Sequence, residues 1–185
     1  MIFSEEAVIV MKTIVIYKTK YGSAKVYAEY ISEKLGCDCV EAKKVKPDDL
    51  LMYDNIIYGG GLYAEVINGV GIITKNIKSL SDKKIAVFTT AITPLDCREY
   101  YDGEVIEKNF KNGVPENIRI FNFMGKMKTD ELTPVHRAAL KALKKVMQSR
   151  HNPTEMEKLL IELCDADDDF TNLADAETLI DYMRE

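Results

Sequence analysis

The sequence predicts an α/β fold, a doubly wound sandwich with a five-stranded parallel sheet at its centre. Two observations lead to this prediction. Short segments rich in β-branched and aromatic residues recur five times, and stretches of helical periodicity lie between them. Most of these segments are apolar along their whole length, which is typical of parallel strands covered on both faces. Strands and helices that alternate in this way form a parallel sheet with helices on both of its sides.

The expected strands differ in how deeply they should lie. Four are short and apolar enough to be buried, and a fifth alternates polar and apolar residues as an edge strand does. A run of three glycines follows the third strand, so we expect that strand to end in a glycine-rich loop. In chain order the strands fall at residues 13–17, 37–45 (the edge strand), 54–58, 84–90 and 118–123.

Amphipathic periodicity predicts the helices. The first has apolar residues at helical spacing from Ala24 to Leu35, and Gly36 occupies the usual position of a terminating glycine. A short turn begins at Pro47, and longer helices are expected at 71–80, at 98–110 with an interruption at Gly103, and at 133–147. Thr133 and Pro134 begin this last helix, which has one apolar face made of Ala138, Ala139, Ala142, Leu143 and Val146.

The chain divides into three segments on this basis. Residues 1–11 are an N-terminal arm or a mis-assigned start, with Met11 as the natural first residue, and the sequence leaves both open. Residues 12–149 form the α/β domain, and its final helix is the one at 133–147. Residues 150–185 form a short helical C-terminal extension, with a capping box at 154–157 and a second helix at 175–183.

Composition limits the classes of function. The net charge of −5 argues against a nucleic-acid partner, because such proteins usually carry a basic face. No apolar run reaches the ~20 residues of a membrane-spanning helix, and the first ten residues lack the basic region of a signal peptide. The four cysteines suit free thiols in a reducing compartment, so we expect a cytoplasmic protein.

No metal site is expected. The cysteines and the two histidines lack the spacing of a zinc site. The acidic run at 165–169 has the alternation of a calcium loop. However, Phe170 stands where the turn glycine is needed, and Ala176 stands where a bidentate glutamate is needed.

The loop after the first strand is the strongest functional signal. The strand at 13–17 leads into a loop of small and hydroxyl-bearing residues, which opens a helix. The first N–H groups of a helix lack intrahelical partners and lie at its positive end, so this junction attracts a phosphate. The sequence lacks both GxxxxGK[ST] and GxGxxG after the first strand, and acidic residues are missing from the strand ends. A P-loop NTPase, a dinucleotide-binding site and a phospho-receiver domain are therefore disfavoured.

The same loop resembles the phosphate loop of the flavodoxin family, in a segment of similarity from Lys12 to about Met147. The resemblance implies a flavodoxin-like sandwich with strand order 2-1-3-4-5 and FMN as the cofactor. It implies that hydroxyls of Thr19 and Ser23 bind the FMN phosphate and that Gly22 allows close approach of the backbone. The implied cofactor-binding residues of this loop are Thr19, Lys20, Tyr21, Gly22, Ser23 and Ala24.

Two later loops complete the site that the resemblance implies. The loop beginning at Gly59 contributes Gly60, Gly61, Leu62 and Tyr63, and the loop after the fourth strand contributes Thr89, Thr90 and Ala91. Tyr63 either stacks on the flavin or only packs the loop, and a peptide at Gly60 or Gly61 is free to turn toward the flavin. The loop after residue 90 lacks the aromatic residue of many relatives. One flavin face is then open, or is covered by Tyr100, Tyr101 or another chain.

The functional prediction is an FMN-dependent oxidoreductase. Residues 118–127 resemble the flavodoxin-type protoporphyrinogen oxidase branch, which suggests a porphyrinogen or a quinone as substrate. FMN carries the redox chemistry, so no side chain is expected to be catalytic, and His136 is expected to be a surface residue. A redox partner protein or a small electron donor or acceptor is implied, and a homo-oligomer stays open. The alternatives are a one-electron carrier flavodoxin and a flavin-free scaffold or binding module.

Overall fold

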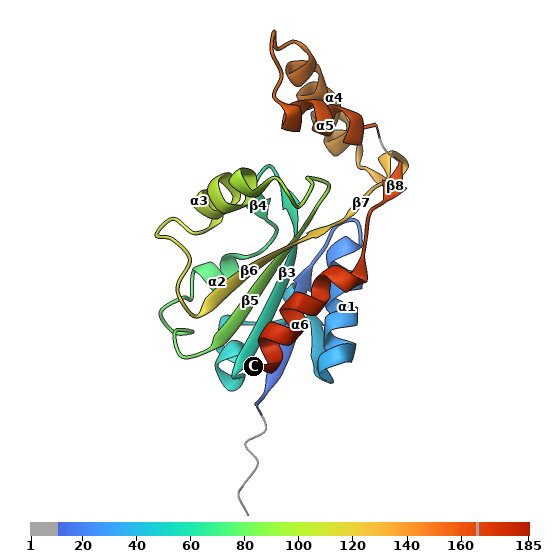
Figure 1. Ribbon diagram of the computed structural model, residues 1–185. Helices are drawn as coiled ribbons and strands as arrows, with labels where there is room; N and C mark the ends of the chain where they lie inside the picture. Colours follow the sequence, from blue (N-terminus) through green and yellow to red (C-terminus); the bar gives the residue numbers. More distant parts are fainter. Residues whose placement is uncertain (1–10, 166) are drawn as a thin grey trace, which may run out of the picture.

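A computed structural model describes residues 11–165 and 167–185, so the expectations for residues 1–10 lie outside the described part. Five strands run parallel in the order β2-β1-β3-β5-β6, which confirms the predicted doubly wound sheet. All five strand tips end at the same edge of the sheet (Figure 1). Their bounds are β1 (Thr13–Lys18), β2 (Asp38–Glu41), β3 (Asn55–Tyr63), β5 (Lys84–Ala91) and β6 (Ile118–Met124).

The third strand is longer than the sequence predicted, because β3 continues through Gly59, Gly60 and Gly61. Gly59 pairs with Phe88 of β5, and a Cβ atom on Gly59 would lie only 2.0 Å from the Phe88 ring. Gly59 therefore makes room for the Phe88 ring, and the three glycines continue the strand and do not begin a loop. The chain turns at Ala64 and Glu65, where φ is 47° and 62°, and returns antiparallel as β4 (Val66–Ile67).

One face of the sheet is covered by α1 (Ser23–Leu35) and α6 (Glu177–Arg184) (Figure 1). The expected face of α1 is buried, and Gly36 ends the helix in the left-handed conformation. The core on this side joins α1 and α6 to inward-facing strand residues such as Val15, Ile57 and Phe88. The three large apolar residues of α6, which are Leu179, Ile180 and Met183, are buried in it.

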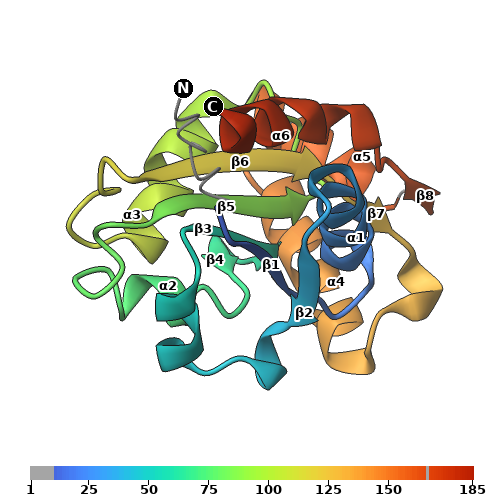
Figure 2. The same cartoon turned by 90° about the horizontal axis from the view of Figure 1, so that it is seen from below.

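The opposite face is covered by short elements, with α2 (Gly71–Thr74) and α3 (Ile106–Asn109) on that side (Figure 2). The helix expected at 71–80 is a single turn. The helix expected at 98–110 is a π-helical segment, Tyr100–Val105, followed by α3, so the interruption expected at Gly103 appears as a widened turn. The remaining short turns are η1 (Ala42–Lys44), η2 (Pro47–Met52), η4 (Thr129–Glu131) and η5 (Leu173–Ala176).

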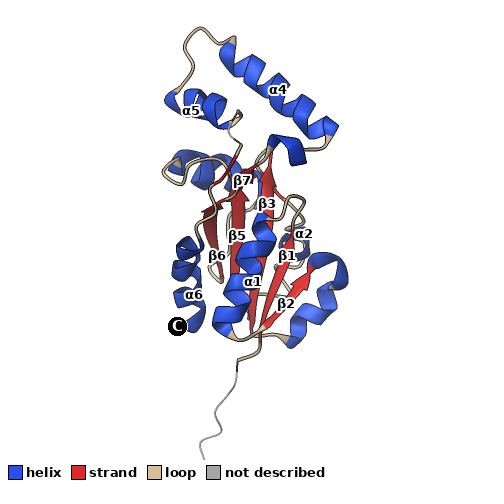
Figure 3. Cartoon of the chain, turned by 90° about the vertical axis from the view of Figure 1, so that its right-hand side faces the viewer, coloured by secondary structure: helices blue, strands red, loops and turns tan. Residues whose placement is uncertain are grey.

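A helical hairpin stands above the carboxyl ends of the strands (Figure 3). It consists of α4 (Pro134–Gln148) and α5 (Glu155–Leu163), which pack on each other. Its base is a two-stranded ribbon of β7 (Lys126–Met127) and β8 (Asp168–Asp169). The expected acidic run therefore lies partly in β8.

The last helix of the sandwich is α6, so the expectation that the helix at 133–147 fills this role is wrong. The predicted apolar face of α4 points to solvent: Leu143 is 52% exposed and Val146 is 54% exposed. Both α4 and α6 are amphipathic, but α6 packs on the sheet whereas α4 packs mainly on α5. The chain therefore leaves the sandwich after β6, forms the hairpin, and returns to complete the core.

This arrangement predicts that two leucines contribute very differently to the free energy of unfolding. Leu179→Ala removes a fully buried side chain of α6 and is expected to lower the free energy of unfolding by about 2–5 kcal/mol. Leu143→Ala on α4 is expected to change it by less than about 0.5 kcal/mol, because that side chain is exposed. Urea titrations of both variants measure the difference. Equal losses would contradict the assignment of α6 to the core.

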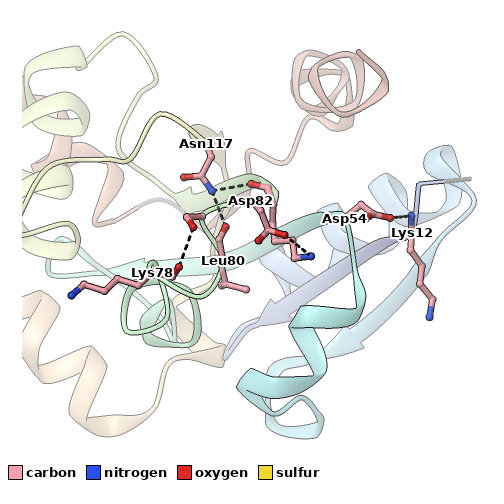
Figure 4. Close-up of polar contacts among 8 residues, drawn as sticks. Lys12, Asp54, Lys78, Leu80, Asp82 and Asn117 are labelled. Atoms are coloured by element: carbon pink, nitrogen blue, oxygen red, sulfur yellow. Dashed lines mark hydrogen bonds and ion pairs between the residues drawn. The ribbon is translucent and has the colours of Figure 1, made fainter. Parts of the chain in front are cut away.

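Polar contacts at the amino ends of the strands hold the opposite edge of the sheet (Figure 4). The side-chain amide of Asn117 donates to the carbonyls of Leu80 and Lys83, at 3.0 Å and 2.8 Å. The Asp54 carboxylate accepts from the backbone N–H of Lys12 at 2.8 Å. Among the described residues, no helix has the length and apolar character needed to cross a membrane.

Candidate cofactor site

The junction of β1 and α1 forms the loop that the sequence predicts to hold a phosphate. Gly22 has φ of 98°, and its N–H donates to Thr19 Oγ1 at 2.9 Å, which closes the loop. The helix begins at Ser23, and the backbone amides of Ser23 and Ala24 have no acceptor in residues 11–165 and 167–185. Two free N–H groups at the positive end of a 13-residue helix are suited to bind a phosphate.

Ser23 is hydrogen-bonded to the segment that follows β6, the strand at one edge of the sheet. Its Oγ accepts the backbone N–H of Lys126 at 3.1 Å, so the hydroxyl proton is left to donate to another acceptor. The sequence analysis missed Lys126 as a site residue. The short glycine–lysine sequence after β6 was the only signal, and its position beside Ser23 depends on a contact across 103 residues.

Three aromatic rings gather beside the loop. The rings of Tyr21 and Tyr63 lie 6.3 Å apart in an edge-on arrangement, and the His136 ring lies 5.7 Å from Tyr21 and 5.6 Å from Tyr63. His136 comes from the first turn of α4, so the hairpin contacts the loop directly. The expectation that His136 is a plain surface residue is wrong, because its ring is partly buried in this cluster.

Both ring nitrogens of His136 make polar contacts. Its Nε2 lies 3.2 Å from Lys20 Nζ, and its Nδ1 lies 2.7 Å from the hydroxyl of Tyr21. An ammonium group can only donate, so Nε2 is the acceptor in the contact with Lys20. The sequence analysis could not find this residue, because nothing local connects α4 to the first loop.

Tyr63 folds back over its own strand. Its ring would lie 3.1 Å from a Cβ atom placed on Gly61, closer than an ordinary contact, so glycine favours this approach of the ring. Burial raises the pKa of Tyr63 to about 12, the nearby Tyr21 adds to the rise, and a hydrogen bond with the Lys20 backbone opposes it. The ring therefore lies next to the predicted phosphate loop, and its stacking on a flavin stays a prediction.

The elevated pKa of Tyr63 predicts an alkaline effect on stability. Ionisation is disfavoured in the folded state, so this tyrosine's contribution is complete below pH 10 and is lost as the pH rises toward 12. The free energy of unfolding should therefore fall less steeply in Tyr63→Phe than in the natural chain above pH 10. Urea titrations at pH 8, 10 and 11 measure the two slopes, and parallel slopes would contradict the prediction.

The other residues expected from the second loop lie in strand β3. Gly60 pairs with Lys18 and Thr89, and a Cβ atom on it would lie 2.8 Å from the carbonyl oxygen of Asn68. Gly61 accepts the N–H of Asn68 at 2.9 Å, and Leu62 packs against the core. The expectation of a freely turning peptide at Gly60 or Gly61 is therefore wrong, because both are held within the sheet.

The residues expected from the third loop end strand β5. Thr89 is fully buried and its hydroxyl donates to Asn122 Oδ1 at 2.8 Å, while Thr90 is almost fully buried. The Ala91 carbonyl accepts the N–H of Gly125 at 2.7 Å. The loop itself begins at Ile92, three residues after the predicted start at Thr89, so these three residues belong to the strand that supports the loop.

Tyr100 and Tyr101, the two tyrosines considered as residues that could cover a flavin face, lie in the π-helical segment after this loop. Tyr101 is buried, and its hydroxyl donates to the carbonyl of Thr93 at 2.6 Å. Burial raises the pKa of Tyr100 to about 12, and the nearby Glu65 adds to the rise. Tyr101 is therefore part of the core and is not free to cover a flavin. A hollow of about 440 Å³ lies between the start of the π-helix and α6; Tyr101 lines it, but none of the residues predicted to bind the cofactor do.

The strand order and the free amides at the start of α1 together define a parallel α/β protein with a candidate phosphate site at the carboxyl edge of its sheet. The family model of the flavodoxin domain matches residues 14–155, which is more than half of the chain. The chain therefore belongs to the flavodoxin family, and this membership supports FMN as its cofactor.

Comparison with solved structures gives matches of low identity. An archaeal flavodoxin is 17% identical, covers 84% of this chain and 97% of its own, and has a TM-score of 0.37. Oxidised flavodoxin 2 from Bacillus cereus is 16% identical, covers 90% and 99%, and has a TM-score of 0.40. The Fusobacterium nucleatum flavodoxin bound to flavin mononucleotide is 13% identical, covers 60% and 78%, and has a TM-score of 0.37. No curated protein sequence matches the chain.

Proposed function

We propose that this protein is an FMN-dependent oxidoreductase that passes electrons through a flavin bound at the carboxyl edge of its sheet. The observation that carries the proposal is the set of free donors after β1. The amides of Ser23 and Ala24 and the hydroxyl proton of Ser23 are available to bind a single anion at the start of α1. Bound FMN would supply the redox chemistry itself.

The side chains around the loop have binding roles in this proposal. Thr19 fixes the loop by accepting the Gly22 amide, and Ser23 donates to the phosphate. Tyr63 and Tyr21 offer flat faces beside the loop, where an aromatic ring system can stack. None of these residues acts as an acid, a base or a nucleophile, which agrees with a cofactor that carries the reaction.

We propose a planar electron acceptor, a quinone or a porphyrinogen-type ring, as the substrate class. The loop that follows Ala91 carries no aromatic residue as far as Pro94, and Tyr101 is held in the core, so no ring from there covers one side of the site. The resemblance of residues 118–127 to the protoporphyrinogen oxidase branch supports the same class.

The four cysteines are free, which agrees with a cytoplasmic location.

Turnover tests this proposal. The FMN-loaded protein is given a reduced nicotinamide and a panel of quinones, and the rate is compared with that of the same concentration of free FMN. A rate at least about 10-fold above free FMN is expected for an enzyme. A rate equal to that of free FMN for every acceptor would contradict the enzymatic proposal.

A one-electron carrier is the second candidate, and the net charge of −5 favours it because an acidic protein can dock on a basic redox partner. Stepwise anaerobic reduction separates the two. A carrier is expected to accumulate the one-electron-reduced flavin, whereas direct passage to the two-electron level favours the enzyme. A protein that binds no FMN at micromolar concentration would instead support a scaffold or binding module.

A further inference from the structure

Lys126 is held against the phosphate loop by its backbone. The strand β6 ends at Met124, and the Gly125 amide donates to the Ala91 carbonyl at 2.7 Å. The next amide, that of Lys126, donates to Ser23 Oγ at 3.1 Å. A Cβ atom on Gly125 would lie 3.1 Å from the same Oγ, closer than an ordinary contact, so glycine favours this approach. The backbone of Lys126 is thus fixed to the first turn of α1.

The Lys126 side chain crosses the start of α1. Its Cε and Nζ atoms lie 3.9 Å from the position of a Cβ on Gly22, in the middle of the loop. The ammonium makes an ion pair with Glu131 Oε2 at 2.7 Å, and its side chain is 23% exposed. The cation is therefore partly shielded from water beside the free amides of Ser23 and Ala24, where its attraction for an anion is stronger than at an open surface.

The neighbouring cation has a different role. Lys20 also lies in the loop, but its ammonium contacts the ring of His136 at 3.2 Å. Lys128, two residues beyond Lys126, donates to the carbonyl of Asp167 at 2.9 Å and so contacts the ribbon at the base of the hairpin. Of these three lysines, Lys126 is the one whose ammonium lies at Gly22.

We infer that Lys126 is a phosphate-binding residue that makes this site select a phosphorylated flavin over riboflavin. The inference rests on the proposed function and deepens it. A phosphate at the start of α1 would receive hydrogen bonds from the amides of Ser23 and Ala24, and the ammonium would add a positive charge near Gly22. Riboflavin lacks the phosphate and gains nothing from that charge.

The test compares the affinities for FMN and for riboflavin, measured by quenching of flavin fluorescence at low and high salt. Lys126→Met is expected to weaken FMN binding about 10- to 100-fold, as for the loss of a charge-assisted hydrogen bond, and to leave riboflavin binding within about 2-fold. The salt dependence of FMN binding should also decrease. Lys126→Arg, which keeps the charge, should retain most of the selectivity.

Two further variants serve as controls. Lys128→Met removes a lysine of the same segment that contacts Asp167, and it should leave both affinities unchanged. Glu131→Gln removes the carboxylate that pairs with the Lys126 ammonium. It should tighten FMN binding about 2- to 5-fold, because the ammonium then gives up no ion pair with Glu131 when it binds the phosphate. Melting curves without flavin identify any variant that is misfolded.

The outcomes separate the inference from the proposed function. FMN and riboflavin affinities that fall equally in Lys126→Met, or that both stay unchanged, would overturn the inference while the natural chain still binds FMN. A natural chain that binds neither flavin would overturn the proposed function and the inference with it.

Discussion

Gly22→Val is expected to lower the affinity for FMN at least about 100-fold, which corresponds to about 2.7 kcal/mol. Gly22 has φ of 98°, a conformation that a β-branched residue adopts only with strain. Relief of that strain has to move the loop and with it the free amides of Ser23 and Ala24. Isothermal titration of the flavin-free variant with FMN measures the loss.

Gly113→Val is the matched control for this variant. Gly113 also has a positive φ, 79°, and nothing lies within 4 Å of a Cβ placed there. It lies between α3 and β6, so the same kind of strain is introduced away from the loop. The control should lose stability but keep its affinity for FMN. Similar losses of affinity in both variants would contradict a specific role for the Gly22 loop.

Gly59→Ala is expected to lower the free energy of unfolding by about 3 kcal/mol, the upper range for overpacking a core. The added Cβ would lie 2.0 Å from the Phe88 ring, which is fully buried between α1 and the sheet. The ring has to change position in a core that already contains Tyr27 and Phe123 around it. Chemical denaturation measures the cost.

A double-mutant cycle tests the stated cause. Phe88→Leu removes part of the ring's volume, so Gly59→Ala should cost less in that background by at least about 1 kcal/mol. Gly103→Ala is the control, because a Cβ there meets nothing within 4 Å, and its effect should be below about 1 kcal/mol. Additive losses in the double variant would show that contact with Phe88 is not the reason for a glycine at position 59.

The junction of β1 and α1 could be predicted because its signals are local. A short apolar strand, a hydroxyl-rich turn with Gly22 and a periodic helix stand next to one another, and the structure keeps all three in order. The alternation of strands and helices likewise predicted the parallel sheet, because connection rules leave few arrangements for such a pattern.

Features that depend on distant contacts could not be predicted in the same way. Both α4 and α6 are amphipathic, and only their tertiary surroundings decide that Leu179 is buried while Leu143 is exposed. The three glycines of β3 have the pattern of a loop, and pairing with β5 overrides it. Lys126 and His136 reach the phosphate loop from segments more than 100 residues away. Their roles follow from the path of the hairpin, which no local pattern specifies.

The most direct test of the account is the visible spectrum of the protein after incubation with FMN and removal of unbound flavin, with chromatography of the flavin released on denaturation. Binding at the loop after β1 predicts one equivalent of FMN per chain and little retention of riboflavin under the same conditions. A protein that stays colourless after exposure to micromolar FMN would contradict a flavin site at this edge of the sheet.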